Sequence, residues 1–377
     1  MTDKIKRYLK ENREELYKIL YELCMIPAPS HHEEKRAEYC KAWFLKNGME
    51  EAYIDEALNV VYPYQAKDSQ ELVVFAAHTD TVFPDMEPLP YSDDGEKIFS
   101  PGVGDDTASV AVLMLSAKFL KENNVKTQGI LFVCNSCEEG LGNLKGTREI
   151  FKCYEGRIKR FITFDSSRFN SSADRCVGSH RYEVEVLTVG GHSWSRFGNK
   201  NAIAALASII GDIYSIDLPK KEGKRVTYNV GLIEGGTSVN TIAQNAKMIC
   251  EYRSDDEELL AYMQNRFAEI FKSLKSQEVT VNVTLLGERP CEKGVNPQDM
   301  DYMRSVLNGI INDVVGDTVN YHSSSTDCNI PLSMGIPAIS VGVYNGGGAH
   351  TREEWIDKES LFIGLEVGIR TVLGFME

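Results

Sequence analysis

Histidine and carboxylate side chains follow three apolar segments of this chain, and these are the residues with the clearest capacity for chemistry. His78 and Asp80 come at the end of "ELVVFAAHTD", Glu138 and Glu139 follow "GILFVCN", and Asp165 ends "RFITFD". Carboxylates seldom lie at the end of a buried strand unless they are paired or bind a metal ion. Imidazole and carboxylate ligands together suit Zn2+, with Co2+ or Mn2+ as alternatives.

Two more candidates lie in glycine-rich loops. Asp105 is part of "SPGVGDDTASV", and His350 is part of "NGGGAHTREE". The full set exceeds the roughly four ligands that one zinc ion takes, but it fits two metal ions about 3.5–4 Å apart that share a carboxylate. In such a site, one of two adjacent glutamates can bind a metal while the other accepts a proton from water.

The segments that must hold these residues alternate between apolar strands and helices. Strands are predicted at 71–78, 129–135 and 160–165, and a helix that starts near Asp105 separates the first two. Apolar strands separated by helices predict an α/β sheet that is covered on both faces. Sheets of this kind place ligands beyond the carboxyl ends of their strands, where the candidate residues lie.

Two helices are predicted before the first strand. Apolar residues recur at helical spacing over 4–24. A second helix is predicted to start at Ser30, because Ser30 with Glu33 three residues later forms a capping-box pattern.

The pattern changes in the middle of the chain, where strands and helices follow the order β-α-β-β-α-β. The predicted elements are a strand at 181–191, a helix at 201–216, strands at 227–236 and 246–254, a helix at 255–277 and a strand at 279–288. This order is the split βαβ motif of ferredoxin-like domains. We therefore predict an inserted α+β domain at 178–290 within a catalytic metal-binding domain formed by 1–177 plus 291–377.

The composition excludes several classes of partner. The chain has 377 residues and a net charge of −14, so neither a nucleic acid nor an anionic membrane is an expected partner. No apolar run reaches the roughly 20 residues of a membrane span, and the charged first 30 residues do not resemble a signal peptide. The nine cysteines are expected to be reduced thiols, which predicts a cytoplasmic protein.

Seven short stretches, taken together and in order, resemble a known family. They are "HTDTV", "GVGDD", "EEG", "FD", "GGHS", "GGTSVN" and "AHTREEW", and they run from residue 78 to residue 355. The set resembles the zinc metallopeptidase family of peptidase T, carboxypeptidase G and succinyl-diaminopimelate desuccinylase. The resemblance implies a zinc-exopeptidase-like mixed sheet flanked by helices, with an inserted ferredoxin-like lid domain.

The resemblance also implies a role for each residue of the catalytic domain. Asp105 would bridge two metal ions, and Glu138 would act as general base and then as general acid. Asp80 would hold His78 in one tautomer, as carboxylates behind metal-binding histidines do. The implied metal ligands are His78, Asp105, Glu139, Asp165 and His350.

In the inserted domain the resemblance implies residues that bind substrate. His192 of "GGHS" would reach a substrate carbonyl, and in several relatives it does so from the partner subunit, which suggests a homodimer through this domain. Asn240 and Arg253 would bind the polar backbone or the carboxylate end of the substrate. The resemblance further implies a cis peptide bond after Asp105, although Thr107 stands where many relatives have lysine or asparagine.

Each of these residues also has a plainer interpretation. Asp105 could cap the following helix, Asp165 could belong to a turn, and Glu138 with Glu139 could form a solvated loop. Arg253 could be a surface ion-pair partner. The metal site would be absent only if the plainer interpretation held at all five proposed ligand positions together.

The predicted activity is hydrolysis of short peptides by a metallo-exopeptidase. Aspartate at position 165 favours the peptidase T-like branch, and hence an aminopeptidase or tripeptidase. The alternatives are a carboxypeptidase or an N-acyl-amino-acid deacylase of the same family. A non-catalytic protein that binds metal or peptide is the alternative from another class, and it would not need Glu138.

Overall fold

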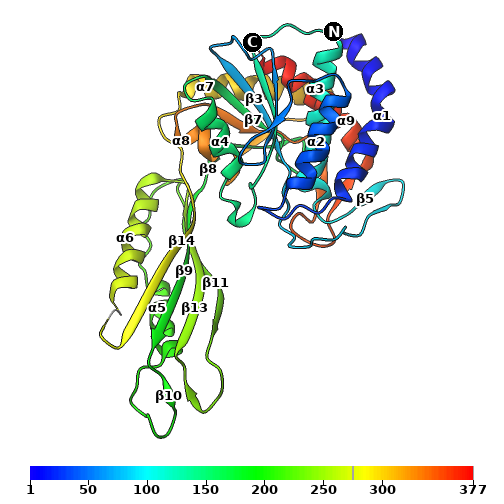
Figure 1. The fold of residues 1–377 in the computed structure, drawn as a ribbon. Helices are drawn as coiled ribbons and strands as arrows, with labels where there is room; N and C mark the ends of the chain where they lie inside the picture. Colours follow the sequence, from blue (N-terminus) through cyan, green and yellow to red (C-terminus); the bar gives the residue numbers. More distant parts are fainter. Residues whose placement is uncertain (274–275, 377) are drawn as a thin grey trace. The chain divides into compact units, whose positions relative to one another are not determined.

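A computed structural model describes residues 1–273 and 276–376, and it divides the chain into two compact units (Figure 1). Unit 1 comprises Met1–Cys176 and Lys293–Glu377, and unit 2 comprises Val177–Glu292. The end of the helix predicted at 255–277 falls partly outside the described residues. Among the helices that are described, none is both long and apolar enough to cross a membrane.

A six-stranded mixed sheet forms the centre of unit 1. Its strands, in spatial order, are β1 (Tyr53–Ile54), β2 (Val60–Tyr64), β6 (Ile130–Asn135), β3 (Leu72–His78), β7 (Ile158–Thr163) and β16 (Ala338–Ser340). β3, β6, β7 and β16 are parallel, whereas β1 and β2 are antiparallel to their neighbours. Because parallel strands end at the same edge, the segments that follow β3, β6 and β7 meet there. The predicted mixed α/β fold is thus confirmed.

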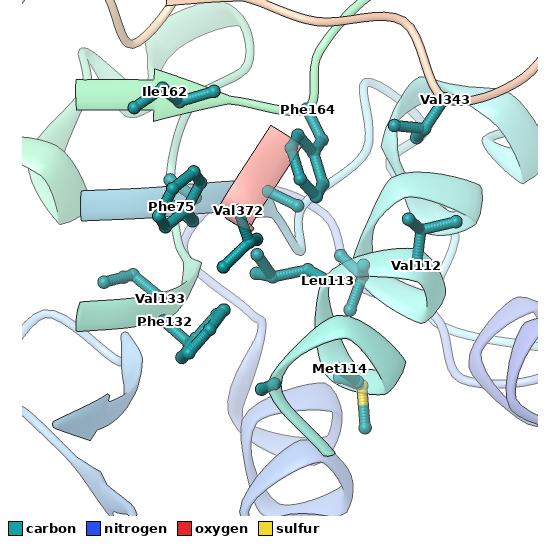
Figure 2. Packing of buried hydrophobic residues seen from close by; sticks show 14 of the residues in the cluster. Phe75, Val112, Leu113, Met114, Phe132, Val133, Ile162, Phe164, Val343 and Val372 are labelled. Carbon is teal, nitrogen blue, oxygen red and sulfur yellow. The ribbon is translucent and has the colours of Figure 1, made fainter. Parts of the chain in front are cut away.

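Helices cover both faces of this sheet. Phe75 of β3 is paired with Phe132 of β6, and both rings face Leu113 of α3 (Ser109–Glu122) in the core that Figure 2 shows. Phe161 of β7 points the other way and packs on Phe151 of α4 (Lys145–Cys153). Two long helices, α1 (Thr2–Cys24) and α9 (Lys358–Phe375), pack against α3.

Several short elements of unit 1 complete the surroundings of the sheet. A small sheet has the order β17 (Gly346–Gly347), β18 (Trp355–Asp357), β5 (Lys97–Phe99) and β4 (Ser92–Asp93). Unit 1 also contains α7 (Pro297–Val315), α8 (Asn329–Ser333) and two short helical turns, Val103–Ala108 and Gly140–Gly142. β8 (Ser171–Cys176) pairs in parallel with β15 (Asn320–Ser324), a pair that was not predicted because neither polar segment shows a clear strand pattern.

The start of the second helix differs from the prediction. α2 spans Glu34–Lys46, and its N-cap residue Glu33 makes no capping hydrogen bond through its side chain. The capping-box prediction for Ser30 is therefore wrong. The Ser30 hydroxyl instead donates a hydrogen bond of 2.6 Å to Asp80 Oδ2, because a buried carboxylate is a stronger acceptor than a neutral group.

Unit 2 has the predicted order of strands and helices. The elements are β9 (Gly178–Thr188), α5 (Ala202–Tyr214), β11 (Val226–Gly235), β13 (Asn245–Ser254), α6 (Glu257–Ser273) and β14 (Val279–Arg289). The four strands form an antiparallel sheet in the order β11-β13-β9-β14, and both helices contact β9 and β13. A short ribbon, β10 (Gly191–His192) paired with β12 (Thr241–Ile242), extends from this sheet.

Candidate metal site

Asp105 lies between two histidines, with one carboxylate oxygen directed at each. Its Oδ1 is 3.1 Å from His78 Nε2, and its Oδ2 is 3.1 Å from His350 Nε2. Glu139 Oε1 is 3.0 Å from the same His350 nitrogen. A carboxylate that presents its two oxygens in different directions has the arrangement that a bridging ligand between two metal ions requires.

Three groups of side chains at this edge of the sheet could each hold a metal ion, since their ligand atoms lie within 4.8 Å of one another. The first group contains Asp165, the second contains Glu138, and the third contains His350. The groups are His78 with Asp105 and Asp165; His78 with Glu138 and Glu139; and Asp105 with Glu139 and His350. The first and third groups share Asp105 and together include all five predicted ligands. Two imidazoles among carboxylates fit a divalent cation such as zinc.

The fold explains why residues so distant in sequence converge. His78 is the last residue of β3, the two glutamates follow β6 after a turn at Cys137, and Asp165 follows β7 by two residues. These three strands are adjacent and parallel, so the residues after them share one edge. His350 reaches the same edge from the loop between β17 and β18.

Burial and neighbouring charges shift the pKa values of the histidine and carboxylate groups at the site. Burial raises the pKa of Glu139 to about 7, although the hydrogen bond with His350 opposes this. Hydrogen bonds with Asp105 and Glu139 raise the pKa of His350 to about 11. Burial alone would raise the pKa of Asp105, but hydrogen bonds with His350 and His78 hold it below its usual value. Divalent cations can replace the protons that these groups otherwise share.

Asp80 organises the residues around it through its carboxylate. Oδ1 accepts a hydrogen bond of 2.9 Å from the backbone amide of Glu138, and Oδ2 accepts one of 2.9 Å from the amide of Glu139. The Nδ1 atom of His78 lies 3.0 Å from the Asp80 carbonyl oxygen and 3.4 Å from Asp80 Oδ1. A proton on Nδ1 directed at either acceptor leaves Nε2 facing Asp105, free to bind a metal.

Two acidic residues at the site were missed in the sequence. Glu354 is buried and accepts hydrogen bonds from three backbone amides of the loop that carries Asp105. Asp106 Oδ2 accepts a hydrogen bond of 3.0 Å from the backbone amide of His78. No spacing pattern marks either residue, because their partners are backbone groups that are distant in sequence. The Asp105–Asp106 peptide bond is cis, which confirms that prediction.

The predicted substrate-binding residues of unit 2 lie in two separate places. His192 of β10 is beside Asn240, whose carbonyl oxygen accepts a hydrogen bond of 2.9 Å from the amide of Ser193. Arg253 lies near the far end of β13, where its Nε is 2.7 Å from Glu251 Oε1. The nine residues of β13 from Asn245 to Arg253 span about 26 Å. The structure therefore brings His192 and Asn240 together but does not bring Arg253 to them.

Comparison with known proteins agrees with the family resemblance seen in the sequence. The sequence profile described as peptidase family M20/M25/M40 matches residues 74–374. A probable carboxypeptidase of Ajellomyces capsulatus is 23% identical over 251 residues, which cover 59% of this chain and 57% of the relative. The chain thus spans little more than half of the length of that relative.

Solved structures share the fold over nearly the whole chain. A tripeptidase from Staphylococcus aureus has a TM-score of 0.74 at 20% identity, covering 96% of this chain and 99% of its own. A dinuclear metal-binding peptidase from Bacillus subtilis has a TM-score of 0.65 at 13% identity, covering 98% of this chain and 100% of its own. At such identities the similarity shows the fold alone.

Proposed function

The chain belongs to the peptidase family M20/M25/M40, and from this premise we propose that it is a two-metal exopeptidase that removes terminal residues from short peptides. The family supports hydrolysis of peptide bonds, and the two metals and the aminopeptidase or tripeptidase specificity are the finer parts of our proposal. The observation that carries the proposal is the position of Asp105 between His78 and His350, with one oxygen directed at each. The fold that the chain shares with a tripeptidase also supports it.

The proposed cofactors are two divalent cations, with Zn2+ favoured and Co2+ or Mn2+ as alternatives. When bound, they supply Lewis acidity that polarises a substrate carbonyl and eases the deprotonation of water. Asp105 would be the shared ligand. The residues that would hold the two cations are His78, Asp105, Glu139, Asp165 and His350.

Glu138 is the proposed proton carrier. It is buried, its backbone is held by Asp80, and its carboxylate belongs to the group that contains His78 and Glu139. Glu138 would accept a proton from water as the water oxygen bonds to the carbonyl carbon. It would then deliver this proton to the amide nitrogen as the C–N bond breaks, which gives a free amine and a carboxylic acid that ionises. A binding protein would have no need for such a base, so Glu138 favours an enzyme.

Unit 2 would contribute groups that bind the substrate. His192 would donate a hydrogen bond to the oxyanion that develops on the carbonyl, with Asn240 beside it, and Arg253 would bind the carboxylate end. An extended tripeptide spans about 10 Å, whereas His192 and Arg253 are separated by most of the length of β13. We therefore propose a homodimer through unit 2, in which one copy supplies Arg253 and the other supplies His192 and Asn240.

The test is hydrolysis of three substrate sets by the purified protein, with a chelator and with added Zn2+, Co2+ or Mn2+. The sets are free di- and tripeptides, peptides blocked at the amino end, and N-acetylated amino acids. We expect metal-dependent release of the first residue from free tripeptides only. Release of the last residue from blocked peptides would instead indicate a carboxypeptidase, the activity in the name of one relative. Release of acetate would indicate a deacylase, and metal uptake without turnover would indicate a binding protein.

The cellular location is also a proposal. Within residues 1–273 and 276–376, none of the nine cysteines forms a disulfide bond, and eight of them are buried. A large protein with an odd number of cysteines and no disulfide among them suits a reducing compartment, so we propose that the protein is cytoplasmic.

A further inference from the structure

Glu354 places a buried carboxylate beneath the loop that carries Asp105. Its Oε2 accepts a hydrogen bond of 2.6 Å from the amide of Gly102, and its Oε1 accepts bonds of 3.0 Å from Gly104 and 2.8 Å from Asp105. Glu354 is only 2% exposed to solvent. Three amide donors that converge on one carboxylate form a cradle for an anion, and bonds of this kind are stronger than those between neutral groups.

Glu354 also connects this loop to the segment that carries His350. The two residues are four positions apart, and Glu354 directly precedes β18. The backbone carbonyl of Glu354 accepts a hydrogen bond of 3.2 Å from the amide of Ser100, and Trp355 is paired with Phe99 of β5. The segment from 350 to 355 is therefore hydrogen-bonded to the 99–105 loop through its backbone and through the carboxylate of Glu354.

The loop approaches Glu354 so closely that it requires glycine. A Cβ atom added at Gly104 would lie 3.0 Å from Glu354 Oε1 and 2.9 Å from the hydroxyl oxygen of Tyr344. Gly102 has a φ of 75°, and a Cβ atom there would lie 2.7 Å from Thr81 Cγ2. The loop thus leaves no room for a side chain at Gly104, beside Glu354 and Tyr344, or at Gly102, beside Thr81.

Glu354 is not one of the groups that face the proposed metals. It belongs to none of the three clusters of converging ligand atoms found within residues 1–273 and 276–376. The three hydrogen bonds that its carboxylate accepts from the 102–105 loop all come from backbone amides. Its contribution to the site is therefore made through the position of Asp105.

We propose that Glu354 is a positioning residue that holds Asp105 between the two metals and couples the metal subsite of His78 to that of His350. This inference rests on the two-metal site of the proposed function. Without the carboxylate, the three amides lose their acceptor, and the loop can turn Asp105 away from one of the two imidazoles. The metal held by Asp105, Glu139 and His350 should be affected most, because both Asp105 and the His350 segment depend on Glu354.

The test compares Glu354→Gln with Glu353→Gln, which changes the exposed neighbouring glutamate in the same way. Metal-free proteins are titrated with Co2+, and visible absorption and electron paramagnetic resonance report occupancy and the magnetic coupling of bridged ions. We expect Glu354→Gln to weaken binding of the second Co2+ by about 10–100-fold and to diminish the coupling. Glu353→Gln should stay within about twofold of the wild type, and Glu354→Asp should restore part of the coupling.

Unchanged Co2+ affinity and coupling in Glu354→Gln would overturn the inference. If that variant does not fold, Gly104→Ala tests the same contact, since its methyl group would press on the Glu354 carboxylate and on the Tyr344 ring without removing either. Weaker binding of the second Co2+ in Gly104→Ala supports the inference, and wild-type binding overturns it. Peptide turnover by the wild type is measured separately, so a protein without peptidase activity would contradict the proposed function while leaving the role of Glu354 intact.

Discussion

The carboxylate of Asp80 accepts a hydrogen bond of 2.9 Å from the backbone amide of Glu138, and this bond joins the end of β3 to the segment after β6. The other oxygen of the same carboxylate accepts the amide of Glu139. The residue that lies behind His78 therefore also orients the proposed base and one proposed ligand. The family resemblance predicted that Asp80 holds His78, but it did not predict the hydrogen bonds from the amides of Glu138 and Glu139.

Asp80→Asn should impair catalysis more than metal binding. The asparagine side chain has only one acceptor oxygen. Its NH2 group would therefore face one of the two backbone amides that now donate hydrogen bonds to Asp80, and that hydrogen bond would be lost. We expect kcat to fall by about 10–100-fold, with metal content close to that of the wild type. Steady-state kinetics and metal analysis check this. Ser30→Ala, which removes a single hydrogen bond to Asp80, should have a smaller effect, and an unchanged kcat in Asp80→Asn would contradict the assigned role.

Glu138→Gln should separate proton transfer from metal binding. Glutamine keeps the size of the side chain but cannot accept the proton, so we expect kcat to fall by about 10²–10⁴-fold. Metal content should stay near the wild-type value, whereas Glu139→Gln should lose metal. If Glu138→Gln lost metal and Glu139→Gln kept it, the two roles would have to be exchanged.

The strands and the residues at their ends could be predicted because both depend on local pattern. Apolar runs mark β3, β6 and β7, and the acidic residues or histidines that follow them stand out in sequence. Ser30 could not be placed correctly, because its partner Asp80 is fifty residues away and a serine before a helix usually caps it. Glu354 lies within the stretch "AHTREEW", but its role could not be predicted, since its partners are backbone amides about 250 residues earlier in the chain.

Arg36 supports the loop at the point where the sequence departs from many relatives. The guanidinium is buried and donates hydrogen bonds of 2.9 Å to the Thr79 carbonyl, 3.1 Å to Thr107 Oγ1 and 2.8 Å to the Ile26 carbonyl. Arg36→Met would leave these acceptors without a donor, and we expect it to lower the free energy of unfolding by about 2–4 kcal/mol. Thr107→Val should cost only about 1 kcal/mol. Urea unfolding of the metal-free proteins tests both, and equal losses would contradict this account.

His180 should make unit 2 sensitive to acid. Burial lowers its pKa, although the charge of Glu288 opposes this, and its Nδ1 lies 2.5 Å from the Tyr252 hydroxyl oxygen. Because the pKa in the folded state lies below the unfolded value of about 6.5, the unfolded chain takes up the proton more readily. Stability is therefore present above about pH 6.5 and is lost as the pH falls below it.

Hydrogen exchange of the β9 and β13 amides checks this prediction, after correction for the intrinsic pH dependence of exchange. Wild-type protection should fall from pH 7 to pH 5. In His180→Phe, which keeps a ring against Tyr252 but cannot be protonated, the fall should be shallower. Identical slopes in the two proteins would show that another group controls the acid response.

Removal of unit 2 should abolish turnover while preserving metal binding. Ser179 is paired with Arg289 between β9 and β14, so the first and last residues of unit 2 lie close together and a short Gly-Ser linker can join Cys176 to Lys293. Unit 1 has its own extensive hydrophobic core, and all five proposed ligands belong to it, so it should fold and bind Co2+ within about threefold of the full chain.

The shortened protein lacks the proposed oxyanion donor and the residues that would bind the substrate, so its tripeptide hydrolysis should fall by more than about 10²-fold. His192→Ala in the full chain serves as the companion variant, because it removes one of these groups and leaves both units in place. Normal tripeptide turnover by the shortened protein would show that His192, Asn240 and Arg253 take no part in the reaction.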